Sequence, residues 1–175
     1  MLTRRTFIKL HTVIGFAALP WLSACTSGRG NAPAVELVPG KNLYAIWYSC
    51  EGGESGGVER VELIRNDRGE AALSWTSKEY WDAREESGKK TLDASTFDEF
   101  ERMVEEYDLR AASEQPDSGL VAVDADTSGI TFAYVGEDGD MDADNMFSID
   151  EWQELTDEQR EGFWAVIEAL KALES

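Results

Sequence analysis

Three consecutive segments between residues 42 and 76 follow the residue pattern of an antiparallel β-meander. Residues 42–49 carry no charge and are rich in aromatic and aliphatic side chains, which is typical of a central strand that is apolar on both faces. Residues 58–65 and 70–76 alternate apolar with polar residues, as strands with one buried face do. Residues 66–69, Asn-Asp-Arg-Gly, form a typical hairpin turn with glycine in the left-handed position. The sequence therefore predicts three neighbouring antiparallel strands.

Two later segments place apolar residues at helical spacing. The first segment follows Ser95, which resembles a capping box together with Asp98. Its apolar positions are Phe97, Phe100, Val104 and Tyr107. The second segment, residues 157–173, follows a capping box formed by Thr156 and Gln159. We therefore predict two helices, each of which buries one apolar face.

The remaining segments complete the predicted fold. Residues 82–90 are interpreted as a charged loop, and residues 120–124 and 130–135 as two strands joined by a turn at 126–129. The polar residues 136–148 could hold a sixth, irregular edge strand. The order β-β-β-α-β-β-(β)-α predicts an α+β domain, in which an antiparallel sheet carries both helices on one face.

Acidic residues dominate the composition. The chain has 16 basic and 35 acidic residues, a net charge of −19. Without residues 1–24 the chain loses three basic residues and no acidic one, so 13 basic and 35 acidic residues leave a net charge of −22. This charge argues against nucleic-acid binding, because phosphate contacts need Lys and Arg, and against binding to an anionic bilayer surface.

Histidine and cysteine are nearly absent. The only histidine is His11, so the part after residue 25 lacks histidine for acid–base catalysis, for nucleophile activation or for metal ligation. Cys50 is the only thiol after Cys25, which excludes an internal disulfide and a cysteine cluster. We interpret Cys50 as structural. These absences favour a non-enzymatic function.

The first nine residues carry the features of an export signal. Residues 3–9 read Thr-Arg-Arg-Thr-Phe-Ile-Lys, with Arg4, Arg5, Phe7 and Lys9 ahead of an apolar run. This segment resembles the twin-arginine translocation motif, with Ile in place of Leu as the only departure. The resemblance implies export of an already folded protein. The apolar run, residues 13–22, is far shorter than the roughly 20 residues that span a bilayer as a helix.

Residues 22–25, Leu-Ser-Ala-Cys, resemble the bacterial lipobox. The resemblance implies cleavage between Ala24 and Cys25 and a lipid on the Cys25 sulfur. It also implies a bacterial lipoprotein that is anchored to the cell membrane on its extracytoplasmic side. We therefore expect a signal peptide at residues 1–24, a lipidated cysteine and flexible tether at 25–40, and a single acidic α+β domain at 41–175.

One acidic segment resembles the calcium loop of EF-hands. Asp140, Asp142 and Asp144 occupy its first, third and fifth positions, Met146 would contribute its carbonyl oxygen, and Glu151 closes it. Two features depart from that pattern, because asparagine replaces the turn glycine and no helix precedes the loop. The alternative interpretation is a solvated acidic edge of the sheet. Calcium is therefore a candidate cofactor, and no other cofactor is predicted.

Aromatic residues gather on the first predicted sheet. They are Tyr44, Trp47, Tyr48, Trp75, Tyr80 and Trp81. They could form a stacking platform for sugars or peptides, or they could be core pairs across neighbouring strands. The adjacent Tyr80 and Trp81 cannot both point inward on a strand, so one of them is the better candidate for exposure.

Three functions remain after these exclusions. The first is a non-enzymatic, lipid-anchored protein of the cell envelope that binds a protein or a glycan, and the second is a calcium-binding module. The third is a carboxylate-based hydrolase of wall glycans, for which no particular pair of acidic residues stands out. The predicted order of meander, helix, hairpin and helix also resembles that of small bacterial surface lipoproteins.

Overall fold

A computed structural model describes residues 37–52, 56–117, 127–151 and 153–175. These residues belong to one compact unit, Pro33–Ser175. The predicted twin-arginine motif, the cleavage site and Cys25 lie outside the described residues.

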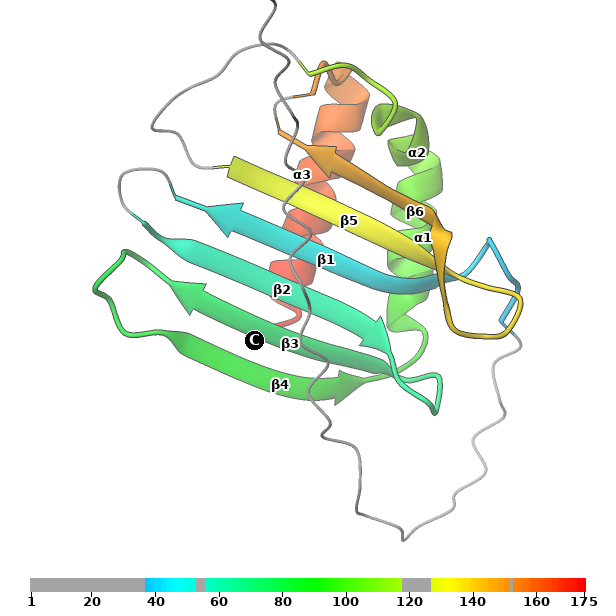
Figure 1. Cartoon of the computed structure of the whole chain (residues 1–175), viewed down its shortest axis with the longest axis horizontal. Helices are drawn as coiled ribbons and strands as arrows, with labels where there is room; N and C mark the ends of the chain where they lie inside the picture. The colour runs from blue at the N-terminus through cyan, green and yellow to red at the C-terminus, as the bar shows by residue number, and fades with distance from the viewer. Residues whose placement is uncertain (1–36, 53–55, 118–126, 152) are drawn as a thin grey trace, which may run out of the picture. The chain divides into compact units, whose positions relative to one another are not determined.

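Six strands of the described chain form one antiparallel sheet (Figure 1). They are β1 (Leu43–Glu51), β2 (Val58–Arg65), β3 (Ala71–Lys78), β4 (Glu86–Leu92), β5 (Thr127–Val135) and β6 (Met141–Asp150). Their spatial order is β4-β3-β2-β1-β5-β6. β1 lies in the middle because it pairs with β2 on one side and with β5 on the other. The predicted α+β class and the central position of the first strand are therefore confirmed.

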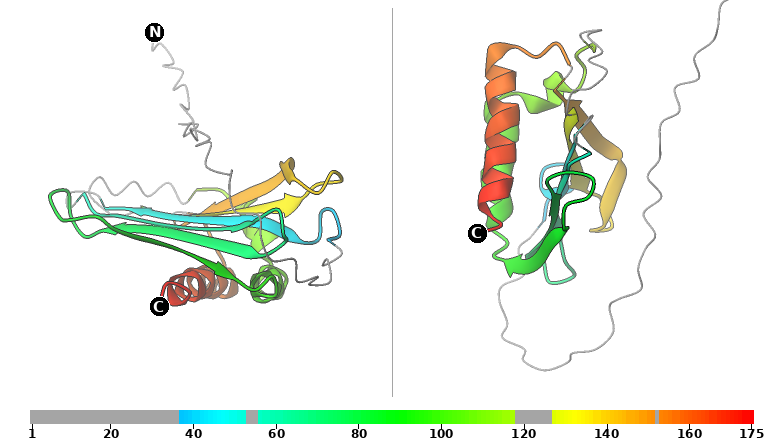
Figure 2. Two further views of the ribbon diagram at one scale, coloured as in Figure 1. Left: turned by 90° about the horizontal axis from the view of Figure 1, so that it is seen from below. Right: turned by 90° about the vertical axis from the view of Figure 1, so that its left-hand side faces the viewer.

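The helices in the described ranges are α1 (Thr96–Glu106), α2 (Leu109–Ala112) and α3 (Asp157–Ala172). α1 and α3 pack on the same face of the sheet, as predicted, so this unit has two layers (Figure 2). The short α2 is not predicted. It follows Asp108, whose φ of 48° lies in the left-handed region and redirects the chain between α1 and α2.

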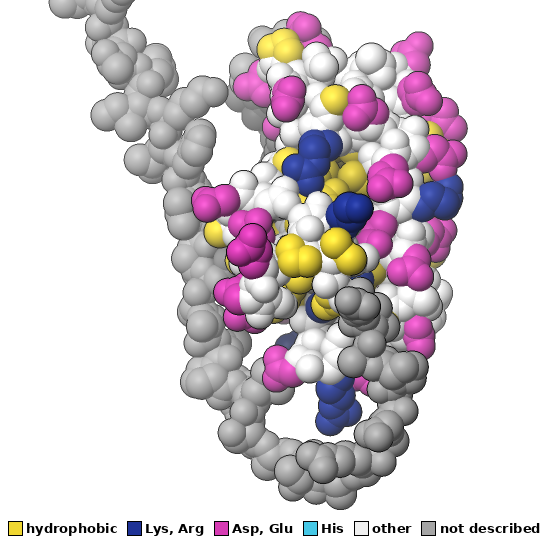
Figure 3. Space-filling view, turned by 90° about the vertical axis from the view of Figure 1, so that its right-hand side faces the viewer, with side chains coloured by type: hydrophobic (Ala, Val, Ile, Leu, Met, Phe, Trp, Pro, Cys, Tyr) yellow, Lys and Arg dark blue, Asp and Glu magenta, His cyan; other side chains and the backbone are white. Residues whose placement is uncertain are grey.

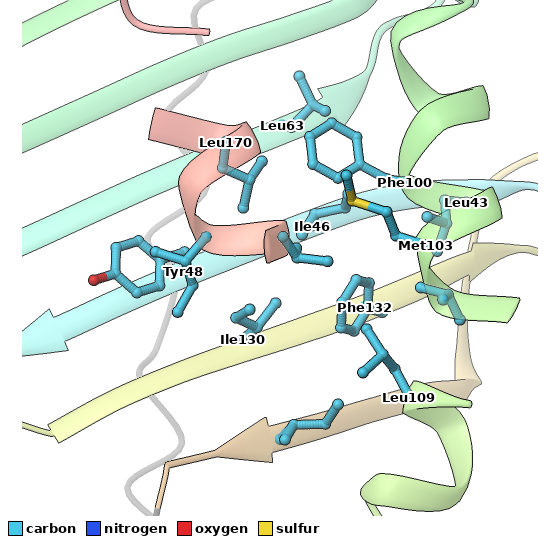
Figure 4. Packing of buried hydrophobic residues seen from close by; sticks show 14 of the residues in the cluster. Leu43, Ile46, Tyr48, Leu63, Phe100, Met103, Leu109, Ile130, Phe132 and Leu170 are labelled. Carbon is cyan, nitrogen blue, oxygen red and sulfur yellow. The ribbon is translucent and has the colours of Figure 1, made fainter. Parts of the chain in front are cut away.

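The hydrophobic core fills the space between this face of the sheet and the helices (Figure 4). Ile46 and Tyr48 of β1 are buried, and Phe100 and Met103 of α1 pack near them together with Leu170 of α3. Side chains alternate along a strand. The residues of β1 that alternate with Ile46 and Tyr48 therefore face the other side of the sheet. No described helix covers that second face, which we call the open face.

The prediction of a charged loop at residues 82–90 is wrong, since β4 covers most of this segment. Gly88 pairs with Trp75, and a Cβ atom added at Gly88 would lie only 2.1 Å from Cζ2 of that indole ring. Glycine is therefore required where the ring packs on the strand. Lys89 and Lys90 follow it, and charged residues are common on edge strands because they discourage pairing with another chain.

The turn predicted at residues 126–129 is also wrong. Thr127, Ser128 and Gly129 belong to β5 and pair with the last residues of β1. The composition of a turn is overridden here by pairing with the central strand. The strand predicted at residues 120–124 lies outside the described residues. The sixth strand is confirmed as β6, at the edge of the sheet.

The two predicted helix caps have different outcomes. Thr156 and Gln159 form the predicted capping box at α3, with N···O distances of 3.2 and 3.1 Å. Ser95 makes no side-chain cap bond at α1, so that prediction is wrong. Instead, Asp93 Oδ1 accepts hydrogen bonds from the Ser95 amide and hydroxyl at 2.9 and 2.7 Å. Because both bonds favour the carboxylate, they lower the pKa of Asp93.

Candidate binding surface

A row of polar side chains lines the open face over β2, β3 and β4. Register fixes which side chains are neighbours: Arg60 pairs with Thr76, and Thr76 pairs with Ser87. Two residues away on each strand, Glu62 pairs with Ser74, and Ser74 pairs with Lys89. Residues that are far apart in sequence therefore form two adjacent rows on one flat surface.

These two rows surround a shallow depression of about 380 Å³. Its lining consists of Arg60, Glu62, Ser74, Trp75, Thr76, Ser87, Gly88 and Lys89. Six of these eight residues end in a hydroxyl, carboxylate, guanidinium or ammonium group. The depression is therefore suited to a polar ligand.

The charged groups of the depression interact weakly with their neighbours. Arg60 Nη2 lies 3.0 Å from Glu51 Oε1, and both side chains are more than half exposed. An exposed pair of this kind contributes about 0–1 kcal/mol, so Arg60 can exchange this partner for a ligand at little cost. Ser74 Oγ donates to Glu62 Oε2 at 3.1 Å. The Lys89 side chain forms no hydrogen bond or ion pair with another described residue.

Tyr80 and Trp81 lie in the turn between β3 and β4, beyond Thr76 and Ser87 along these strands, and neither lines the depression itself. Both are exposed, Tyr80 at 46% and Trp81 at 72%, because they occupy a turn and neither points into the core. The prediction that one of them is the better candidate for exposure fits Trp81, although Tyr80 is exposed as well. Lys78 Nζ donates to the Trp81 carbonyl, and the Ala83 amide donates to the Tyr80 carbonyl at 2.9 Å.

Two glycines let a neighbouring loop pack against this turn. A Cβ atom at Gly56 would lie 2.9 Å from the Trp81 Cβ, and one at Gly57 would lie 2.6 Å from the Glu79 carbonyl oxygen. Gly56 also has a φ of +64°, which disfavours any other residue. The close approach supports the backbone beneath the two exposed rings.

The other aromatic residues do not join this surface as one platform. Tyr48 is buried in the core, where burial and the neighbouring carboxylate of Glu59 raise its pKa. Trp75 also packs on the helix-covered side. Trp47 lies half-buried on the open face, between Glu62 and Thr131 of the two flanking strands. Tyr48 and Trp75 therefore fit the alternative interpretation, in which the aromatic residues form core pairs across neighbouring strands.

The residues of the predicted calcium loop lie in an extended strand. Asp140 precedes β6, while Asp142, Asp144 and Met146 belong to it and Glu151 follows it. The loop conformation is therefore wrong, because Met141, Asp142 and residues 146–150 pair with β5, with a register shift between the two paired stretches. Among the described residues, no three His, Cys, Asp or Glu side chains lie close enough to hold a metal ion. Calcium binding itself stays a prediction.

A second polar cluster closes the core where α3 ends, and sequence reasoning missed it. Tyr48 Oη donates to Glu59 Oε2 at 3.3 Å, and Lys171 Nζ donates to the same oxygen at 2.8 Å. Burial and the nearby Glu59 raise the pKa of Glu174. Cys50 is a half-buried free thiol beside Tyr48. These contacts attach the end of α3 to β2, which is a structural role.

The chain enters the domain at the opposite end of β1. The Gly40 amide donates to the Val135 carbonyl at 2.8 Å, and the Val135 amide donates to the Asn42 carbonyl at 2.9 Å. Arg110 stacks over Tyr134 here, at 4.6 Å from the ring centroid. Figure 3 views this end, where basic and apolar side chains gather in the middle and acidic ones surround them.

Comparison with models of known protein families and with curated proteins found no match. Within the described ranges, none of the helices has the length and apolar character needed to cross a membrane.

Proposed function

We propose that this chain is an exported, lipid-anchored protein of the bacterial envelope whose domain binds an extracytoplasmic ligand or protein on its open face. The twin-arginine motif and the residues around Cys25 support export and anchoring. The open face supports binding, since an uncovered sheet with a polar depression and exposed aromatic rings is typical of recognition surfaces.

The single observation that carries this proposal is the placement of the surface relative to the chain entry. The described chain enters β1 at Leu43, whereas the turn with Tyr80 and Trp81 lies beyond the other end of that strand (Figure 1). Nine residues of strand separate the two ends by roughly 30 Å. A tether that begins at Cys25 would therefore leave the turn with Tyr80 and Trp81 on the side of the domain that is farther from the anchor, while the depression lies beside the middle of β1.

A non-enzymatic function is the interpretation that the residues favour. The sequence after residue 25 contains no histidine, and the lining of the depression contains one carboxylate, Glu62, without a second one that could act as its acid or nucleophile partner. Ser74 donates a hydrogen bond to Glu62, and among the described residues the hydroxyls of Thr76 and Ser87 form no hydrogen bond with a carboxylate or lysine that could act as a base. Binding requires none of these catalytic partners.

The anchor is tested by Cys25→Ala in the full chain. We expect the variant to lack incorporated fatty acid and to leave the membrane fraction, or to accumulate as the uncleaved precursor. Labelling and fractionation identical to those of the wild type would refute lipidation at this residue.

Binding through the open face is tested by a photo-crosslinking amino acid in intact cells. Introduced at Ser87, it should form adducts, whereas the same group at Glu158, an exposed position of α3, should form few. Equal labelling at both positions would argue against a binding face.

A further inference from the structure

We propose that the depression on β2–β4 and the turn with Tyr80 and Trp81 form one glycan-binding site. Its ligand would be a pyranose chain that stacks on Trp81 and hydrogen-bonds to the side chains of the depression. This inference rests on the proposed binding function and names its ligand class.

The lining of the depression matches a ligand covered in hydroxyl groups. Arg60 and Lys89 are donors, Glu62 is an acceptor, and the hydroxyls of Ser74, Thr76 and Ser87 can be either. Sugar hydroxyls also donate and accept, so they can satisfy all of these groups together. An apolar ligand would remove the same groups from water without replacing their hydrogen bonds, which costs about 1–3 kcal/mol for each group.

Trp81 offers what the depression lacks, a flat apolar surface. Its side chain is 72% exposed, and Tyr80 beside it is 46% exposed. The CH groups on one face of a pyranose ring pack well on an indole, whose rim still hydrogen-bonds to water. The close packing of Gly56 and Gly57 fixes the backbone of the turn, so little conformational entropy is lost on binding.

The depression and the turn with Tyr80 and Trp81 are connected along β3. Thr76 lines the depression, and Lys78, two residues farther along the same side of the strand, donates to the Trp81 carbonyl. Two strand residues span roughly 7 Å. A short oligosaccharide can therefore contact the rings of the turn and the hydroxyl rows at the same time.

Two other ligand classes fit less well. The net charge of −22 after residue 24 repels nucleic acid. A protein partner would be expected to find a central apolar or aromatic anchor, whereas six of the eight residues that line this depression end in hydroxyl or charged groups.

Binding can be measured with the purified full-length protein in detergent. A glycan array gives the first screen, and calorimetric titration follows with tetrasaccharides of β-1,4-linked glucose and of β-1,4-linked N-acetylglucosamine. Trp81→Ala should weaken binding about tenfold, the loss of one stacking contact of roughly 1.4 kcal/mol. Ser87→Ala should weaken it several-fold.

Trp164 provides a matched control, because it is also exposed, at 41%, but lies on α3. Trp164→Ala should leave affinity unchanged. Absence of any bound glycan, or equal losses for Trp81→Ala and Trp164→Ala, would overturn the glycan site. Melting curves of each variant distinguish a lost contact from a lost fold.

These outcomes differ from failure of the proposed function. If no glycan binds while the crosslinker at Ser87 still forms adducts with a protein in cells, the glycan inference fails and binding by the open face stands. If the Cys25→Ala variant stays lipidated, the anchor is wrong, whereas the array result is unaffected.

Discussion

Glu101 connects α1 to the start of β1 and to a buried arginine, so its removal should strongly destabilise the domain. Glu101 Oε1 accepts from the Leu43 amide at 2.7 Å and lies 3.5 Å from Arg65 Nη2. The Arg65 side chain is only 3% exposed, and its carbon Cζ lies 4.2 Å from the centroid of the Phe97 ring. Burial lowers the pKa of Arg65, and the charge of Glu101 opposes that shift.

Glu101→Ala would leave the guanidinium buried with the carbonyl oxygens of Leu43 and Gly69, at 2.7 and 3.3 Å, as its remaining acceptors. Breaking a buried ion pair costs about 3–5 kcal/mol, and we expect the lower end because the Glu101 side chain keeps 19% exposure. A loss of about 3 kcal/mol should lower the melting temperature by roughly 10 °C for a domain of this size.

Urea unfolding followed by tryptophan fluorescence measures this loss. Glu101→Gln keeps the side-chain oxygen that accepts from Leu43 but removes the charge, so it should lose less, about 1–2 kcal/mol. Glu105→Ala, at an exposed position one turn later on α1, should change stability by less than about 0.5 kcal/mol. If Glu101→Ala unfolds with the same free energy as Glu105→Ala, the buried pair does not stabilise the domain.

Three further predictions concern other parts of the chain. Gly88→Ala should lower stability by about 1–3 kcal/mol in the same urea assay, since the indole ring above it must move; an unchanged midpoint would contradict the close packing. Arg4→Lys with Arg5→Lys keeps the charge but removes both guanidinium groups, so the exported protein should disappear from cell-surface immunoblots. Unchanged surface levels would indicate the general secretory route. Millimolar calcium should raise the melting temperature, and Asp140→Asn with Glu151→Gln should abolish this rise but not the response to sodium chloride at equal ionic strength. Equal responses of wild type and double variant to calcium would leave only a solvated acidic edge.

Elements with a strong local pattern could be predicted from the sequence. The alternation in residues 58–65 and 70–76 matches β2 and most of β3, because each strand buries one face under the helices. The capping box of Thr156 and Gln159 locates the start of α3, since both of its hydrogen bonds are local.

Elements that depend on distant partners could not be predicted. β4 contains a glycine between polar and charged residues, and the reason for that glycine is the ring of Trp75 on another strand. The start of β5 has the composition of a turn, and only its pairing with β1 extends it. A local pattern carries no information on either contact.

The residues of the candidate site also divide into those that could be predicted from the sequence and those that could not. Tyr80 and Trp81 could be singled out because adjacent aromatic residues cannot both be buried on a strand. Arg60, Ser87 and Lys89 become neighbours only through the registers of β2 with β3 and of β3 with β4. Nothing in their separate segments indicates that they share one depression.

The apolar character of β1 on both faces connects the fold with the proposed binding function. Its inner side chains are covered by α1 and α3, yet Trp47 on the open face pairs with Glu62 and Thr131 of the flanking strands, and no described helix covers it. An uncovered sheet face with an aromatic residue at its centre tends to associate with another copy. The net charge of −22 opposes that association by repulsion between copies. A small hydroxyl-rich ligand carries little charge and is not repelled, so a composition that opposes self-association still leaves the open face accessible to a glycan.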